Sequence, residues 1–179
     1  ANANHGTKGA GAAAPTEVAG LVGRAQQFVK TNGTYILCPQ ATPISPSGPF
    51  TMLIVGSLDN SEAAEIMVLA SLGDVFGSAG TEGFGLGWAH TTKRLNFDMY
   101  QLVPSSVRSN MTRNHDFGTT HVMAITWDGT TGANSQRIWV DGAFTGAVSA
   151  VTNLAASNRD LAIGRRSGVS DTLHLTGLI

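Results

Sequence analysis

Residues 120–142 constrain the fold more strongly than any other part of the chain. They read THVMAITWDGTTGANSQRIWVDG, two alternating apolar runs that each end in an Asp-Gly pair. Alternation with a period of two is typical of a strand with two different faces, and Asp-Gly favours a tight reversal between antiparallel strands. A third run follows at once. We therefore expect an antiparallel meander of strands at His121–Trp127, Gln136–Val140 and Ala143–Val148.

Further short apolar runs, separated by turn residues, extend this pattern over most of the chain. The additional predicted strands are residues 25–29, 34–37, 50–58, 65–72, 83–88, 95–102 and 160–164. Residues 61–72 would also suit a helix by propensity, but the strands on either side favour a strand. Short strands at regular spacing, without a convincing helix, predict an all-β fold. We expect a two-sheet antiparallel β-sandwich.

Two of these segments carry more specific expectations. Asn32-Gly33 lies between the runs 25–29 and 34–37 and predicts a hairpin turn. Residues 50–58, FTMLIVGSL, form the longest continuous apolar run, which is typical of a strand buried on both faces. The loop before that strand is marked by four prolines, at Pro39, Pro43, Pro46 and Pro49.

The N-terminal segment has a different composition. Residues 1–16, ANANHGTKGAGAAAPT, are rich in Ala, Gly and Asn and show no apolar periodicity. Such a segment orders only when it lies against something else. We expect residues 1–17 to form an extended arm, held against the domain or, in the favoured interpretation, against a neighbouring subunit, and residues 18–179 to form the sandwich.

Composition excludes several classes of partner. The 179 residues are 42% hydrophobic and only 13% charged, with a net charge of −1. Without a basic patch there is no electrostatic basis for binding nucleic acid or an anionic membrane. Cys38 is the only cysteine, so an internal disulfide is excluded. No stretch reaches membrane-spanning length, and no signal peptide is visible. A surface with so few charged residues is expected to be partly covered, either by a second sheet or by neighbouring subunits.

The meander also carries a family resemblance. HVMAITWDG followed by RIWVDGAFTG resembles the core of laminin-G-like domains of the concanavalin A-like lectin and glucanase superfamily. The matching positions are His121, Ala124, Thr126, Trp127, Asp128, Gly129, Trp139, Val140, Asp141 and Gly142. DLAIG at 160–164, GRAQQFVKTNGTYI at 23–36 and PFTMLIVG at 49–56 are similar to other strands of that family. The resemblance implies a two-sheet antiparallel β-sandwich of the jelly-roll, concanavalin A-like kind. It says little about function, because these are turn and core residues.

Two departures from the family pattern shape the functional expectation. Family members usually continue with one more full strand, whereas here the last strand is expected to be short, absent or supplied by another subunit. The leader and disulfides of secreted members are also missing. Together with the arm, these departures favour a protein displayed on an assembled particle, such as a bacteriophage virion, over a matrix protein.

The enzymes of this superfamily cleave glycans with clustered carboxylates, typically Glu-x-Asp-x-Glu on one strand. One carboxyl group must protonate the leaving oxygen while the other attacks or activates water. The glutamates here are Glu17, Glu62, Glu65 and Glu82, and none lies two or four residues from another acid. The histidines show no metal-binding spacing, and His121 is expected to be a hydrogen-bonded structural residue. We expect no enzymatic activity.

Calcium is the one cofactor that the residue types leave open. Hard-oxygen sites need several carboxylates that converge from loops. The aspartates in or near predicted loops are Asp74, Asp98, Asp116, Asp128, Asp141 and Asp171. Because Asp128 and Asp141 each precede a glycine, turn formation explains them without a metal. No cofactor is therefore expected, with calcium as the alternative.

Sugar binding would use aromatic side chains that stack on pyranose rings. The candidates are Trp88, Tyr100, Trp127 and Trp139. Trp127 and Trp139 occupy positions where the family packs core or cross-strand pairs, so Trp88, next to His90 and a glycine-rich run, is favoured. The predicted ligand-binding residues are Trp88, His90 and Tyr100.

The sequence therefore predicts a non-enzymatic structural module, displayed on a virion as a capsid decoration or tail protein and able to adhere to cell-surface glycans. Its expected partners are neighbouring subunits, contacted through the arm. The alternative is a lectin-like adhesion module of an extracellular protein.

Overall fold

The computed structural model describes residues 6–21, 23–39, 48–58, 66–73, 76, 83–89, 92–101, 107–114, 118–148, 159–167 and 174–179, without the side chains of residues 100, 101 and 107–114. The strands are β1 (Thr7–Lys8), β2 (Thr16–Ala19), β3 (Arg24–Phe28), β4 (Ile36–Cys38), β5 (Phe50–Leu58), β6 (Ile66–Leu72), β7 (Gly83–Ala89), β8 (Arg94–Gln101), β9 (Val107–Asn114), β10 (His121–Trp127), β11 (Gln136–Val140), β12 (Ala143–Val148), β13 (Leu161–Ile163) and β14 (Gly177–Leu178). Two 3-10 helices, η1 (Gly11–Ala13) and η2 (Lys30–Asn32), complete the regular structure. No helix in these ranges is long and apolar enough to cross a membrane.

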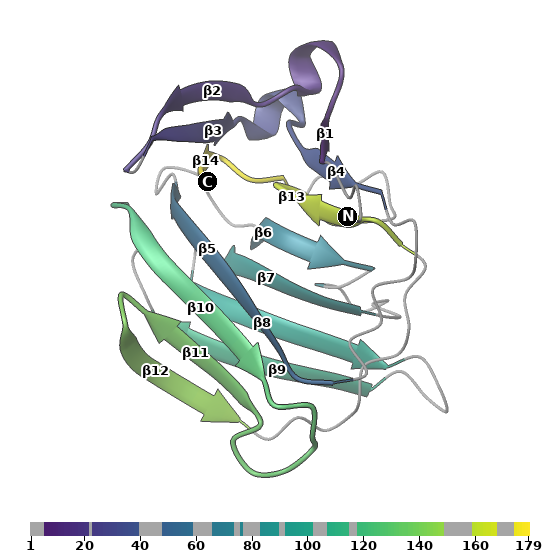
Figure 1. Ribbon diagram of the computed structural model, residues 1–179, viewed down its shortest axis with the longest axis vertical. Helices are drawn as coiled ribbons and strands as arrows, with labels where there is room; N and C mark the ends of the chain where they lie inside the picture. Colours follow the sequence, from purple (N-terminus) through teal and green to yellow (C-terminus); the bar gives the residue numbers. More distant parts are fainter. Residues whose placement is uncertain are drawn as a thin grey trace.

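The strands form two seven-stranded antiparallel sheets that pack face to face. One sheet has the order β1-β4-β13-β6-β7-β8-β9, and the other has the order β12-β11-β10-β5-β14-β3-β2. In Figure 1, β5 and β10 cross in front of β8, and β11 and β12 lie beside them at the lower left. This arrangement confirms the predicted two-sheet antiparallel β-sandwich.

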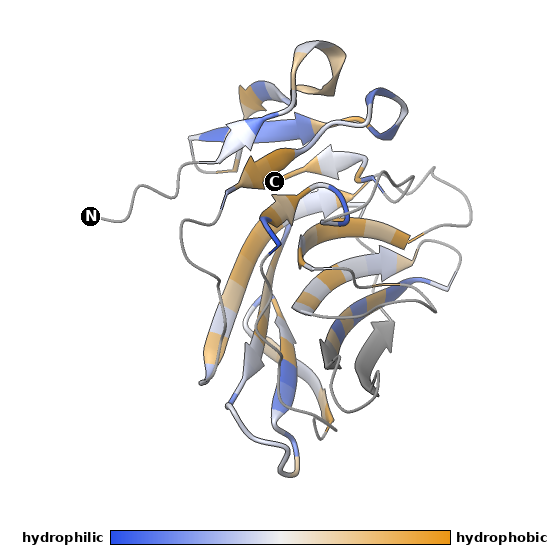
Figure 2. Cartoon of the chain, turned by 90° about the vertical axis from the view of Figure 1, so that its right-hand side faces the viewer, coloured by the Kyte–Doolittle hydropathy of each residue, from blue (hydrophilic) through white to orange (hydrophobic). Residues whose placement is uncertain are grey.

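Alternate side chains from the two sheets fill the space between them. On β10, Met123, Ile125 and Trp127 are buried, and their neighbours along the strand point outward. The Phe50 ring lies 4.6 Å from the Phe84 ring and 6.1 Å from the Trp127 ring, centroid to centroid. Figure 2 shows the resulting hydrophobic bands along the strands of both sheets. Each large apolar side chain buried in this way stabilises the fold by about 1.5–3 kcal/mol.

The meander predicted from residues 120–142 is confirmed with its expected bounds. β10 pairs with β11, and β11 pairs with β12. Asp141 (φ 52°) and Gly142 (φ 78°) form the two-residue turn between β11 and β12, and two positive φ angles are what a tight hairpin needs. The other Asp-Gly pair opens a longer loop, which the Asp128 amide closes by donating to the Ser135 carbonyl at 3.0 Å.

The hairpin predicted at Asn32-Gly33 is wrong. β3 and β4, on either side of it, belong to different sheets. Between them lies η2, which ends at Gly33 (φ 58°), whose amide donates to the Lys30 carbonyl at 2.8 Å. This 3-10 turn carries the chain from one sheet to the other instead of folding it back on its neighbour.

The expectation that residues 50–58 are buried on both faces is also wrong. β5 has the predicted bounds, but only one of its faces lies in the core. Leu53 is 63% exposed and Val55 is 39% exposed. The outer face of β5 therefore presents apolar side chains that the rest of the described chain leaves exposed.

The N-terminal strands lie at sheet edges, and the C-terminal strand lies inside a sheet. β1 pairs with β4 and β2 pairs with β3, so the described residues before 20 add an edge strand to each sheet. The predicted boundary between residues 17 and 18 falls inside β2. β14 is a two-residue strand between β3 and β5. Contact of the N-terminal segment with another subunit stays a prediction.

Candidate functional site

The predicted ligand-binding residues do not form a described surface. Trp88 lies on β7 with 0% of its surface exposed, and the Lys93 ammonium group sits 5.2 Å from the centre of its ring. Its indole faces are therefore covered by protein and are not available to a sugar. His90 lies outside the described residues, as does the side chain of Tyr100, whose backbone pairs with Gly83 in β8 and β7.

A different aromatic surface lies on the outer face of the other sheet. Leu53 of β5 pairs with Ala124 of β10, Ala124 with Trp139 of β11, and Trp139 with Phe144 of β12. The Trp139 and Phe144 rings are 5.8 Å apart in a T-shaped contact, and Phe144 is 60% exposed. These four residues, here called the apolar row, run across four strands.

A second row lies beside the first. It joins Thr51, Thr126, Arg137 and Ala147 across the same four strands. Arg137 is exposed, and its Nε donates to the Asn134 carbonyl at 3.0 Å. This polar row offers hydroxyl groups and a guanidinium group. Arg137 lies two residues before Trp139 on β11 and points to the same side of the sheet.

Two open hollows follow these rows and share Arg137. The larger one, of about 620 Å³, is lined by Asn134, Arg137, Trp139, Phe144, Gly146 and Ala147. The smaller one, of about 320 Å³, is lined by Pro49, Phe50, Thr51, Thr126, Trp127, Asp128, Ser135 and Arg137. A strand irregularity between Ile138 and Trp139 lies at the larger hollow. Such bulges re-aim side chains.

Asp128 lines the smaller hollow and is held as a turn residue. Its Oδ1 accepts hydrogen bonds from the Thr130 hydroxyl at 2.7 Å and from the Thr130 amide at 2.9 Å. These bonds, together with the positive charge of Arg137, lower the pKa of Asp128 below its ordinary value, so the carboxylate is charged at neutral pH. Trp127 also stabilises the loop between β10 and β11, because its Nε1 donates to the Thr130 carbonyl at 2.7 Å.

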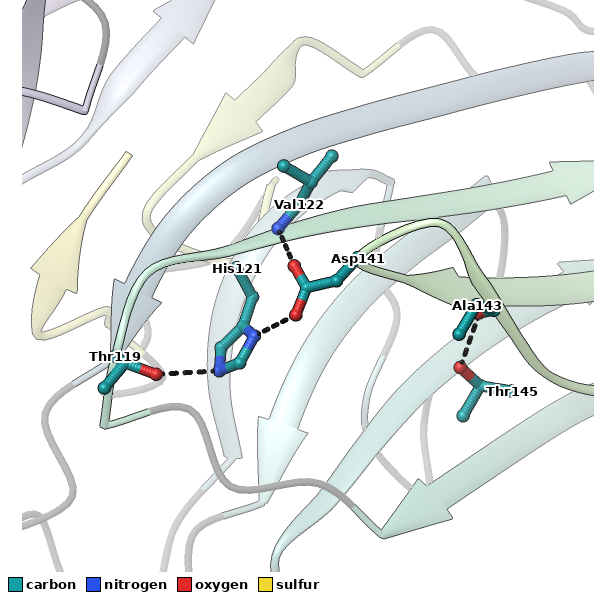
Figure 3. A network of polar contacts seen from close by, with 6 residues as sticks. All are labelled: Thr119, His121, Val122, Asp141, Ala143 and Thr145. Atoms are coloured by element: carbon teal, nitrogen blue, oxygen red, sulfur yellow. Dashed lines mark hydrogen bonds and ion pairs between the residues drawn. The ribbon is translucent and has the colours of Figure 1, made fainter.

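His121 and Asp141 form a second ordered cluster, at the start of β10 (Figure 3). His121 Nδ1 lies 2.6 Å from Asp141 Oδ2, and His121 Nε2 lies 3.1 Å from the Thr119 hydroxyl. The other Asp141 oxygen accepts a bond from the Val122 amide at 2.9 Å. His121 is therefore hydrogen-bonded, as predicted, and Asp141 ties the β11–β12 turn to β10.

The described residues bring no metal-binding group together. Within the described ranges, no three His, Cys, Asp or Glu side chains lie close enough to hold an ion. Asp74, Asp116 and Asp171, considered for calcium, lie outside those ranges, as do Glu62, Glu65 and Glu82. Asp98 is buried in β8, and Glu17 forms an ion pair with Arg24 at 2.6 Å.

Sequence reasoning included Trp139 among the aromatic candidates but interpreted it as a packing residue. It did not consider Arg137 or Phe144. One usable signal was present: Arg137 and Trp139 alternate with the buried residues of β11, so both must point away from the core.

The fold resembles solved β-sandwich structures at low sequence identity. The binding domain of Paraclostridial Mosquitocidal Protein 1 superposes with a TM-score of 0.66 at 9% identity, covering 98% of this chain and 43% of that one. Domains LG4-5 of the mouse laminin alpha1 chain give 0.62 at 15% identity, covering 92% and 41%. The chain thus spans less than half the length of these two structures. The CBM40 of Ruminococcus gnavus IT-sialidase, bound to alpha2,3 sialyllactose, gives 0.52 at 10% identity, covering 87% of each chain.

No protein-family model matches the sequence, and no curated protein matches it either. The structural likenesses therefore show a shared fold, the laminin-G-like and carbohydrate-binding-module type of β-sandwich.

Proposed function

We propose that this chain is a non-enzymatic carbohydrate-binding module that uses the outer face of β5, β10, β11 and β12. The observation that carries the proposal is the outward-facing pair of Trp139 and Phe144 beside the exposed Arg137. Sugar rings have apolar faces that stack on aromatic side chains, and their hydroxyl groups need polar partners at the edge of that contact. The apolar and polar rows supply both.

Two further points support the proposal. The R. gnavus CBM40, which shares the fold, was solved with a sialylated sugar. In addition, the exposed Leu53 and Phe144 form a surface that nothing in the described chain covers. A contiguous apolar patch of this kind commonly marks a binding site. We place the module at an exposed surface, either on a virion or on an extracellular protein.

Trp139→Ala is expected to weaken glycan binding at least tenfold, because it removes the larger ring of the stacking surface. The wild-type protein is first screened on an array of neutral and acidic oligosaccharides. Its strongest hit is then titrated calorimetrically against wild type, Trp139→Ala and Leu21→Ala. Leu21 is a matched control, since it is 71% exposed and lies outside both rows.

Two results would contradict the carbohydrate-binding proposal. One is an array without any bound glycan, and the other is equal affinity of wild type and Trp139→Ala for the strongest hit. Loss of binding in Leu21→Ala would place the site elsewhere on the molecule.

A second candidate function is that of a subunit in a larger assembly, such as a virion, in which copies of this chain contact one another. A hollow of about 360 Å³ lies near the chain end, lined by Ala19, Gly20, Leu21, Arg24, Ala25, Val55, Gly56, Thr120, Leu178 and Ile179. Its lining is mostly apolar, and its only charged residue, Arg24, is already paired with Glu17. A second copy, with the same low charge, is a suitable neighbour.

Self-association through this hollow predicts that the apparent mass of the protein rises with concentration. We expect Leu21→Asp to suppress that rise, because it places a charge in an apolar contact. Sedimentation equilibrium of both proteins over a range of concentrations measures the effect. A wild-type protein that stays monomeric throughout would contradict the assembly function.

A further inference from the structure

Resting on the proposed carbohydrate-binding function, the geometry points to Arg137 as the residue that selects acidic oligosaccharides, by binding a sugar carboxylate in the larger hollow. The ligand class is an oligosaccharide with at least one uronic or nonulosonic acid unit, lying across β5, β10, β11 and β12.

Arg137 occupies the centre of the surface. It is the one residue that lines both hollows, and it lies in the polar row between Thr126 and Ala147. Trp139, two residues further along the same strand, points to the same side. A sugar stacked on Trp139 therefore has the guanidinium group at its edge.

The guanidinium group is oriented by one hydrogen bond, and its positive charge also interacts with the nearby Asp128 carboxylate. Its Nε donates to the Asn134 carbonyl, and this is its only hydrogen bond with the part of the chain that the structure describes. Arg137 forms no ion pair with the described residues. Because a guanidinium group has five donors in a planar fork, four N–H groups are left for a ligand. Two of them can match the two oxygens of a carboxylate.

The charges along the surface determine where the acidic unit lies. The larger hollow contains no acidic residue, and Arg137 is its only charged side chain. Asp128 lines the smaller hollow, where its charged carboxylate would repel an anion. The acidic unit is therefore assigned to the larger hollow, over Trp139 and Phe144.

The smaller hollow suits a neutral sugar unit. Thr51 and Thr126 line it with hydroxyl groups, and Asp128 can accept hydrogen bonds from sugar hydroxyls. Four strands at a spacing of about 4.8 Å give a surface about 14 Å wide. This width accommodates more than one sugar ring, so both hollows can be filled by one chain.

The test compares matched acidic and neutral probes. Sialyllactose is titrated against lactose, and trigalacturonic acid against its methyl ester, with wild type, Arg137→Gln, Arg137→Lys and Trp139→Ala. We expect wild type to bind at least one acidic probe about tenfold or more tightly than its neutral counterpart, since a hydrogen-bonded charge adds that much. Arg137→Gln should remove this preference by lowering the affinity for the acidic probe to that for its neutral counterpart. Arg137→Lys should restore only part of it, and Trp139→Ala should weaken both classes.

The outcomes separate this inference from the function on which it rests. If wild type binds neutral probes as tightly as acidic ones, or if Arg137→Gln keeps the preference, the role of Arg137 is overturned while carbohydrate binding stands. If wild type binds none of the probes and no glycan on the array, both are overturned. Circular dichroism of each variant verifies that altered binding does not come from misfolding.

Discussion

Replacing Trp88 with alanine is expected to lower the free energy of unfolding by about 3–5 kcal/mol, the range for removing a buried large aromatic side chain. Trp88 is fully buried on β7, in the same core as Phe84 and Leu86. The lost contacts and the remaining cavity both contribute. Domains of this kind are stable by only about 5–15 kcal/mol, so a large share of the stability would be lost. Urea denaturation followed by circular dichroism measures the change.

Trp139→Ala is the matched control for this experiment. Its ring lies on the outer face of the sheet, with Phe144 as its aromatic contact. Because little cavity forms at a surface, we expect a loss of about 1 kcal/mol, close to the value of one aromatic pair. Equal losses in the two variants would contradict the assignment of one tryptophan to the core and the other to the surface.

Asp141→Ala should destabilise the protein by about 2 kcal/mol, although the residue lies in an exposed turn. The substitution removes the acceptor for His121 Nδ1 and for the Val122 amide. It also leaves alanine at φ 52°, a left-handed conformation that a β-carbon disfavours. Denaturation measures the total loss, and faster hydrogen exchange at the Val122 amide would locate it.

Asp141→Asn separates the two causes. Asparagine tolerates the left-handed conformation and still offers an acceptor oxygen, so most of the stability should be kept. If Asp141→Asn were as unstable as Asp141→Ala, the carboxylate charge would matter more than the turn. If neither variant lost stability, the contacts with His121 and Val122 would not anchor the turn.

The sequence predicted the β10–β11–β12 meander correctly, because the strand alternation and the turn residues that define it are close together in the chain. Alternation sets the two faces of β10 and β11, and the Asp141-Gly142 pair supplies the two positive φ angles of the turn. The same holds for the bounds of β5. These elements need no knowledge of distant contacts.

Local pattern fails where the outcome depends on which sheet a strand joins. Asn32-Gly33 looks like a hairpin turn, yet β3 and β4 separate into different sheets. The apolar run 50–58 predicts a strand buried on both faces. The sequence alone does not distinguish an apolar side chain on an exposed surface from one in the core. Leu53 and Val55 are examples.

The two tryptophans show the same limit for the candidate site. The glycine-rich run beside Trp88 favoured it as a ligand-binding residue. These glycines allow close packing instead. A β-carbon on Gly87 would meet Ile66 and Phe76, which belong to a second apolar cluster on that sheet. Trp139 lies in an equally regular alternating run but faces the other way. Alternation in the sequence shows that a strand has two different faces, but it does not show which face is buried in the core.

β11 holds the core and the proposed binding surface in one five-residue strand, with Gln136, Ile138 and Val140 inward and Arg137 and Trp139 outward. Ligand preference can therefore change by single substitutions at the outward positions while the interior stays intact. Insertions and deletions behave differently. The loop between Asp128 and Ser135 can vary in length, but one residue added within the strand would exchange its two faces and abolish packing and recognition together. Under the proposed function, specificity would therefore change through point substitutions on the strands and through the length of the loop beside them.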